Sequence, residues 1–345
     1  MTISVALATY NGAPFLAQQL ASIAGQTRLP AELVISDDGS TDETLAVVER
    51  FARTAPFAVR VLTRPERLGF ADNFLVAAEA CRHPLIAFCD QDDVWLPDKL
   101  RVAMDRMAID DSLLSLHTLT VTDAALCPTG FHWKQGINRD TVFEPLQIDP
   151  FGTGWGNTML FRSTLLGLIP RAQRPRNPGV DRPLSHDAWI YELAAALGRV
   201  SHIATPLILY RQHGENTSGS TRQRRRSKLL AMARVPIIEY RARAKFEARM
   251  AALFAELAEK PGDFAAPARK AAEHVAKRQA YWASRVDVFD STTFAKRLAA
   301  FHETRALTAD SPLWIGSRIK DLVLGVAGLG STPIGAPLLS EPLPF

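Results

Sequence analysis

Strand-like and helix-like segments alternate along the first third of this chain, and this alternation restricts its fold more than any other pattern. Residues 3–8 are apolar and strand-like, and residues 14–25 carry apolar side chains at helical spacing. The same pair of patterns recurs at 33–36 with 44–51, at 58–62 with 70–80, and at 85–89 with a helix that begins near residue 97. Repeated units of this kind predict an α/β fold with a mostly parallel, Rossmann-like sheet and helices on both faces.

The pattern changes after residue 110. Strands are predicted at 113–121, 157–162 and 203–210, and a helix at 187–197, while residues 127–149 form a less regular excursion that contains proline and glycine. From about residue 220 the sequence is alanine-rich and helical as far as residue 306. We therefore expect a sheet domain at residues 1–218 and a helical C-terminal extension at residues 219–345.

Charge composition restricts the partners. The 345 residues carry a formal net charge of +4, which argues against a nucleic-acid partner. Basic side chains are concentrated at residues 222–250, where ten stand against two acidic ones. The run Arg222–Lys228 is compatible with peripheral contact to anionic lipid head groups, and a solvated basic face is the alternative.

Cysteine usage and the amino terminus indicate where the protein works. The cysteines Cys81, Cys89 and Cys127 are odd in number and lack metal-ligand spacing, as is typical of a reducing compartment. The segment Met1–Tyr10 lacks the basic start and long apolar stretch of a signal peptide. A cytoplasmic location is expected, and peripheral placement at the inner face of the cell membrane is the alternative.

An acidic cluster follows the strand predicted at 85–89. This apolar run is too short for a helix, and it delivers Asp90, Asp92 and Asp93 within four residues. Adjacent carboxylates repel one another, and hard divalent ions such as Mg²⁺ or Mn²⁺ relieve this repulsion while binding phosphate oxygens of a substrate. The cluster predicts a metal and diphosphate site. A solvated turn is the alternative.

Three polar segments each follow a predicted strand directly. They are Thr9–Gly12, Asp37–Ser40 and Asp90–Asp93. In sheets of this class, ligands bind beyond the carboxyl ends of the strands. We therefore expect the side chains of these segments to converge on one crevice.

Several motifs together resemble the family 2 glycosyltransferases, which have a GT-A fold. The resemblance runs from about residue 3 to residue 218, and the motifs that carry it are Ala8–Gly12, Gln26–Thr27, Asp37–Asp42, Leu68–Phe74, Asp90–Lys99, His186–Asp187 and Tyr210–His213. The late segment Tyr210–Thr217 is most similar to the rhamnosyltransferase branch. The resemblance implies inverting transfer of a sugar, with rhamnose the leading candidate, from a UDP- or dTDP-sugar to a saccharide or lipid-linked saccharide acceptor in bacterial surface polysaccharide synthesis.

The resemblance also implies a nucleotide-sugar site. Asp38 would accept the imide N–H of uracil or thymine, and the Tyr10 ring would pack on the base. Asp90 would face the ribose and Asp92 the cation, in an Asp-X-Asp arrangement on extended backbone. Thr9, Asn11 and Gln91 complete the predicted site. The alternatives are a turn or capping role for Asp38, strand-end packing for Tyr10, and loop hydrogen bonds for Asp93.

Later residues are expected to supply the chemistry and the acceptor contacts. Asp187, at a predicted helix start, would be the general base, although the family usually has a glutamate where His186 stands. His213 would complete the metal shell or hold the diphosphate, and Arg211 would contact the diphosphate or acceptor. Trp155 and Asn157 would form an acceptor platform, and a tight turn beside a core indole is the alternative.

Two other functions compete with this interpretation. Asp90–Val94 also matches the Asp-X-Asp-X-Val nucleophile pattern of haloacid-dehalogenase-type phosphatases, but three strand-helix units precede it here, whereas that fold carries the motif on its first strand. A non-catalytic sugar-binding protein is the second alternative. Replacement of Asp187 separates these functions, because sugar binding would survive and transfer would not.

Overall fold

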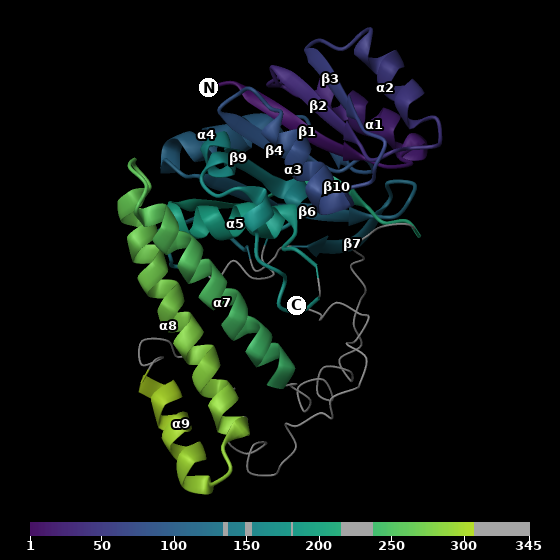
Figure 1. The fold of residues 1–345 in the computed structure, drawn as a ribbon. Helices are drawn as coiled ribbons and strands as arrows, with labels where there is room; N and C mark the ends of the chain where they lie inside the picture. Colours follow the sequence, from purple (N-terminus) through teal and green to yellow (C-terminus); the bar gives the residue numbers. More distant parts are fainter. Residues whose placement is uncertain (134–136, 149–153, 181, 215–236, 307–345) are drawn as a thin grey trace. The chain divides into compact units, whose positions relative to one another are not determined.

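The computed structural model describes residues 1–133, 137–148, 154–180, 182–214 and 237–306 (Figure 1). The chain divides into two compact units. The first comprises Met1–Arg174 and Leu184–Ser220, and the second comprises Pro175–Pro183 and Thr221–Phe345. The described strands all belong to the first unit.

The first unit is built on a ten-stranded sheet. Its main path has the order β3-β2-β1-β4-β9-β6-β10-β5, with β7 paired to β6 and β8 to β10. The strands are β1 (Ile3–Thr9), β2 (Glu32–Asp37), β3 (Ala58–Thr63), β4 (Leu85–Cys89), β5 (Val94–Trp95), β6 (Leu114–Thr122), β7 (Pro128–Trp133), β8 (Thr141–Phe143), β9 (Met159–Arg162) and β10 (Val200–Arg211).

Strands β6 and β10 pair in parallel, and the strands β3, β2, β1 and β4 form the larger parallel part of the sheet. In its register Val5 lies opposite both Leu33 and Ala87. Every residue of β1, β2 and β4 is buried, which explains why these strands have apolar runs instead of alternating patterns. The predicted α/β class with its Rossmann-like sheet is confirmed.

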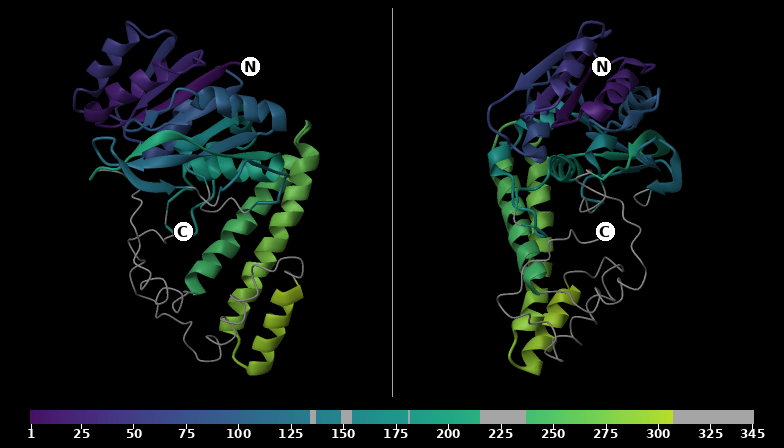
Figure 2. Two further views of the ribbon diagram at one scale, coloured as in Figure 1. Left: turned by 180° about the vertical axis from the view of Figure 1, so that it is seen from behind. Right: turned by 90° about the vertical axis from the view of Figure 1, so that its right-hand side faces the viewer.

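Helices cover both faces of this sheet (Figure 2). They are α1 (Ala13–Ala24), α2 (Thr44–Ala52), α3 (Phe70–Glu79), α4 (Lys99–Asp110) and α5 (His186–Leu197). Helices α1, α2 and α4 share one apolar cluster, to which they contribute Leu20, Val48 and Leu100. Helices α3 and α5 lie on the other face, where Phe74 and His186 both contact Phe88 of β4.

The second half of the sheet differs from the expectation of mostly parallel pairing. Strand β9 is antiparallel to both β4 and β6, and β7 is antiparallel to β6. Strands β6 and β7 are joined by a short connection without a crossover helix, which favours antiparallel pairing. Residues 127–149, expected to be irregular, contain β7 and β8. The helix expected near residue 97 begins at Lys99, because Val94 and Trp95 pair with β10 as strand β5.

The second unit contains the predicted helical extension, with α7 (Ile237–Ala258), α8 (Ala265–Asp290) and α9 (Phe294–Ala306). Helices α7 and α8 share a cluster of Tyr240, Tyr281 and Trp282, and the Arg285 guanidinium lies 4.1 Å from the centre of the Tyr240 ring. The basic run Arg222–Lys228 lies outside the described residues. Within the described part of the chain, each helix is too short or too polar to cross a lipid bilayer.

Candidate active site

Three loops meet at the carboxyl ends of β1, β2 and β4, which are neighbours in the sheet. The Asn11 amide donates to Ser40 Oγ at 2.9 Å, and the Thr41 amide donates to Asn11 Oδ1 at 2.8 Å. The Gln91 side chain accepts from the Tyr10 amide and donates to the Tyr10 carbonyl. Asn11 has a φ of 47°, a left-handed conformation that asparagine adopts more readily than most residues. These bonds bring the loops together as expected from the strand ends.

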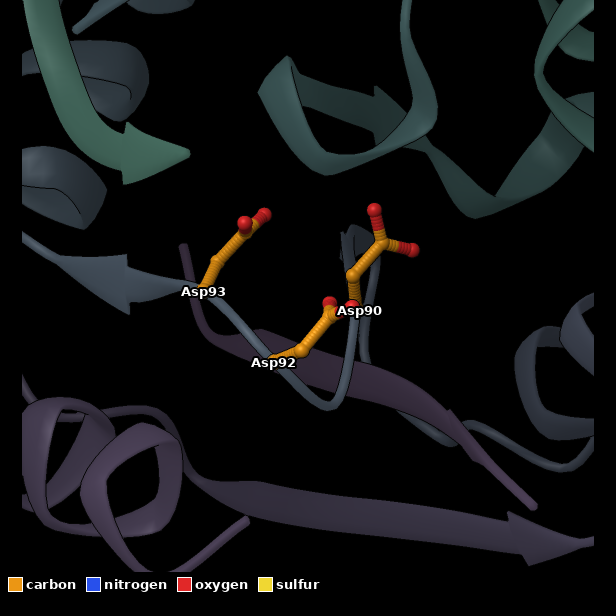
Figure 3. Close-up of side chains that lie close together, drawn as sticks. All are labelled: Asp90, Asp92 and Asp93. Carbon is orange, nitrogen blue, oxygen red and sulfur yellow. The ribbon is translucent and has the colours of Figure 1, made fainter. Parts of the chain in front are cut away.

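The acidic cluster lies on the loop after β4. Asp90, Asp92 and Asp93 each offer a carboxylate oxygen, and these oxygens lie within 4.8 Å of one another (Figure 3). Burial and the charge of Asp92 raise the pKa of Asp93 to about 8. Burial, followed by Asp93, Asp92 and Asp187, raises the pKa of Asp90 well above its ordinary value. A divalent cation would remove the repulsion that causes part of these shifts.

Asp92 and Asp93 differ in their partners. Asp93 is fully buried, and its two oxygens accept from Asn157 Nδ2 at 2.6 Å and from the Arg211 amide at 3.1 Å. Asp92 Oδ2 lies 2.8 Å from Nε2 of His213. Protein donors thus bind both oxygens of Asp93, as in the loop-bonding alternative. Asp92 and His213 place a carboxylate beside an imidazole, a donor set that suits Mn²⁺ or Mg²⁺.

Asp187 lies in the first turn of α5. The Ala188 amide donates to its Oδ1 at 2.8 Å, and the Gly156 amide donates to its Oδ2 at 3.3 Å. Its charge contributes to the raised pKa of Asp90, so the two carboxylates interact electrostatically. The arrangement gives an oriented carboxylate near the acidic cluster, as a general base requires.

His186, which precedes Asp187, lies among aromatic rings. Its ring stacks on Phe74 with 4.0 Å between centroids and meets Phe88 edge-on at 4.8 Å. The residue is only 5% exposed, and neither ring nitrogen has a hydrogen-bond partner among the described residues. Burial lowers the pKa of His186 to about 4, so the imidazole is neutral at pH 7.

The variant His186→Phe is expected to raise Tm by about 2–4 °C at pH 7, because an apolar ring replaces two unpaired buried nitrogens. The gain should be larger at pH 5. The unfolded chain protonates this histidine below about pH 6.5, whereas the folded chain does so only near pH 4, so acidification favours unfolding of the wild type. Thermal melts at both pH values test this, and an equal gain at the two pH values contradicts it.

Asp37 and Asp38 have separate roles at the end of β2. Asp37 closes the turn, since its Oδ2 accepts from the amides of Gly39 and Ser40 at 3.1 and 2.8 Å. Thr9 Oγ1 also donates to Asp37, at 2.9 Å. Asp38 instead accepts from the Leu68 and Gly69 amides, in the loop before α3, at 2.7 and 2.9 Å. The turn-forming role that was the alternative for Asp38 belongs to Asp37.

Two arginines beside Asp38 were not found from the sequence. Arg64 NH1 and Arg67 Nε each lie 3.8 Å from an Asp38 oxygen. The Arg67 guanidinium also lies 3.5 Å from the centre of the Tyr10 ring, which is partly exposed. A single arginine in a loop carries no pattern, so only the folded chain reveals that these side chains surround the predicted base site.

Arg211 and Trp155 lie mainly inside the protein. The Arg211 guanidinium donates to the Asp92 carbonyl at 2.8 Å and to the carbonyl of Ala124 and the Gln18 side chain, each at 2.5 Å. The Trp155 ring packs on Tyr210 with centroids 5.1 Å apart. This packing agrees with the core-indole alternative for Trp155. Direct contact of either residue with diphosphate or acceptor stays a prediction.

Sequence comparison finds a matching family profile and matching relatives. The profile of Glycosyl transferase family 2 matches residues 4–162. The dTDP-rhamnosyl transferase RfbG of Shigella flexneri is 30% identical over 222 residues, which cover 62% of this chain and 74% of RfbG. The chain belongs to glycosyltransferase family 2. This assignment confirms the resemblance and favours a glycosyltransferase over the phosphatase alternative.

Other proteins similar to this family 2 glycosyltransferase extend the comparison. Chondroitin synthase of Escherichia coli is 28% identical over 225 residues, which cover 63% of this chain and 30% of that enzyme. The crystal structure of S. aureus TarS 1–349 in complex with UDP-GlcNAc is 17% identical with a TM-score of 0.53, covering 95% of this chain and 90% of that one. The structural likeness shows the shared GT-A fold.

Proposed function

We propose that this glycosyltransferase moves one sugar from a UDP- or dTDP-sugar, with inversion, to a hydroxyl of a saccharide or lipid-linked saccharide acceptor. The observation that carries the proposal is the acidic cluster after β4 together with Asp187 at the start of α5. The name of the relative RfbG, a dTDP-rhamnosyl transferase, supports rhamnose as the leading sugar. We also propose a role in bacterial surface polysaccharide synthesis, as the resemblance to the family implies.

Recognition of the donor base is assigned to Asp38 and Tyr10. Each carboxylate oxygen can accept more than one hydrogen bond, so Asp38 can bind an imide N–H while it retains the Leu68 and Gly69 amides. The base would stack on Tyr10, and the Arg67 guanidinium must then leave that ring or cover the other face of the base. We assign Thr9, Asn11 and Gln91 to holding the pocket loops together, in accord with their hydrogen bonds.

The donor set at the acidic cluster fits Mg²⁺ or Mn²⁺, because oxygen ligands dominate and one imidazole is adjacent. Asp92 and His213 would hold the ion, and Asp90 would face the ribose. When bound, the ion acts as a Lewis acid that offsets the charge of the leaving diphosphate. Asp93, whose oxygens accept from Asn157 and Arg211, would fix the loop.

Asp187 is assigned the role of general base. It would take the proton of the acceptor hydroxyl while the oxygen attacks the anomeric carbon from the face opposite the nucleoside diphosphate. The bond from the anomeric carbon to the diphosphate oxygen breaks, and its electron pair stays on that oxygen. One displacement of this kind inverts the anomeric centre.

A thermal-shift screen of nucleoside diphosphate sugars with and without Mn²⁺ tests the proposed function. A donor at 100 times its Kd stabilises the folded state by about 2.7 kcal/mol. Uridine or thymidine donors are expected to raise Tm in the presence of Mn²⁺, and guanosine and adenosine donors are not. The proposal is wrong if no pyrimidine donor gives a response that depends on the metal.

A further inference from the structure

A buried lysine lies beneath the acidic cluster. Lys99 is the first residue of α4 and is only 2% exposed. Its Nζ donates to the Asn157 carbonyl at 2.8 Å and lies 2.7 Å from Nε2 of His117. It also lies 4.6 Å from the centre of the Trp95 ring. A lysine is seldom buried so completely unless its amino group has hydrogen-bond or charge partners.

The hydrogen bonds around His117 fix the direction of the contact with Lys99. His117 Nδ1 lies 2.7 Å from the Thr118 carbonyl oxygen, which can only accept, so Nδ1 carries the ring proton. Nε2 therefore accepts from Nζ of Lys99. Burial, with the nearby Lys99 charge, lowers the pKa of His117 well below its ordinary value and keeps the ring neutral. The imidazole thus anchors Lys99 from one side.

The carbonyl that Lys99 holds belongs to the short helical turn η1 (Gly156–Thr158). This turn makes two contacts to the site. The Gly156 amide donates to Asp187, and Asn157 Nδ2 donates to Asp93 in the acidic cluster. A side chain at Gly156 would place its Cβ 2.4 Å from His186 Nε2, so the glycine lets the turn pack closely against α5. One turn therefore connects the candidate base with the acidic cluster.

We propose that Lys99 is a positioning residue that, by holding the Asn157 carbonyl, fixes the separation between Asp187 and the acidic cluster. The inference rests on the proposed function, since it gives the separation a catalytic meaning. The Asp187 carboxylate must reach the acceptor hydroxyl while the acidic cluster holds the donor. A misplacement of about 1 Å between such groups can lower a rate about 100-fold.

The variant Lys99→Met tests this role. Methionine retains the apolar stem but cannot donate to the Asn157 carbonyl. We expect kcat for release of nucleoside diphosphate to fall about 10- to 100-fold, and KM for the donor to change less than about twofold, because the loops of β1 and β2 are untouched. A variant whose kcat equals that of the wild type, and whose KM alone changes, would contradict the inference.

A second variant separates positioning from stability. Lys99→Met leaves the buried His117 nitrogen without its donor, and the double variant Lys99→Met with His117→Leu removes that acceptor as well. Replacing both partners with apolar groups can be nearly neutral for stability. The double variant should therefore recover part of the loss in Tm, since the carbonyls of Asn157 and Thr118 still lack these donors, while kcat stays low. Recovery of kcat together with Tm would show that Lys99 serves stability alone.

Ser201→Ala provides the matched control. Ser201 is fully buried in the same sheet, at the start of β10, and its Oγ donates to Asp110 at 2.6 Å. The substitution removes the hydrogen bonds that the Ser201 Oγ makes with Asp110 and with Ser112 Oγ, so Tm should fall, while kcat should stay within about twofold of wild type. Failure of the wild type to release nucleoside diphosphate from any donor would refute the proposed function, which is a different outcome from unchanged kcat in the Lys99 variants.

Discussion

Replacing Asp187 with asparagine is expected to lower the rate of nucleoside diphosphate release by about 10²- to 10⁴-fold, the usual contribution of a general base. Asparagine retains an oxygen that can accept from the Gly156 amide, so the turn η1 should keep its place. It has no carboxylate to accept a proton. Steady-state kinetics with the best donor and acceptor measure this loss.

Donor binding should survive in the Asp187→Asn variant. The carboxylate interacts electrostatically with Asp90, but its hydrogen-bond partners are on η1 and α5 and not in the loop after β4. Calorimetric titration with the donor in Mn²⁺ should give a Kd within a few-fold of wild type. The control is Asp105→Asn, an exposed carboxylate on α4, which should leave both quantities unchanged. Turnover above about one tenth of wild type in Asp187→Asn would rule out the base assignment.

Replacing Asp92 with asparagine is expected to remove the dependence of donor binding on Mn²⁺. The amide oxygen that remains is neutral and binds hard cations weakly, whereas the wild-type carboxylate lies beside His213 and two further carboxylates. Loss of a residue that supports a metal ligand usually lowers metal affinity about 10- to 100-fold. Asp92 is a proposed ligand itself, so we expect the donor affinity measured in Mn²⁺ to fall at least this far.

The metal-free measurement is the internal control for Asp92→Asn. Wild type and variant should bind the donor equally weakly when the cation is chelated, because the variant lacks only the metal ligand. Equal Mn²⁺ dependence in the two proteins would show that the ion, if one binds, is held without Asp92. A large loss of Tm without metal would show instead that Asp92 supports the loop through His213.

The alternation of strands and helices was sufficient to predict the parallel part of the sheet. Runs such as Ile3–Thr9 and Leu85–Cys89 are buried on both faces, so their continuous apolar composition indicates a parallel sheet covered on both sides. The pairing of β5, β7 and β8 was not predictable. Val94–Trp95 is too short to carry a strand pattern, and its pairing with β10 depends on residues more than 100 positions away in the sequence.

The candidate site, like the sheet, could be predicted from the sequence only in part. The loops after β1, β2 and β4 could be brought together from topology alone, because parallel strands end at one edge. The contacts of Asp93 with Asn157 and Arg211 could not be predicted, because these residues are far apart in the sequence and become neighbours only in the folded chain. Lys99 was visible in a motif, but its buried position under the cluster follows from packing of α4 on β6.

The most direct test of the account is a side-by-side measurement of donor Kd and turnover for wild type, Asp92→Asn and Asp187→Asn in Mn²⁺. We predict that wild type binds and turns over the donor, that Asp92→Asn binds it about 10- to 100-fold more weakly with reduced turnover, and that Asp187→Asn binds it but turns it over about 10²- to 10⁴-fold more slowly. Two variants that both bind and turn over the donor like the wild type would contradict the claim that these carboxylates serve one active site.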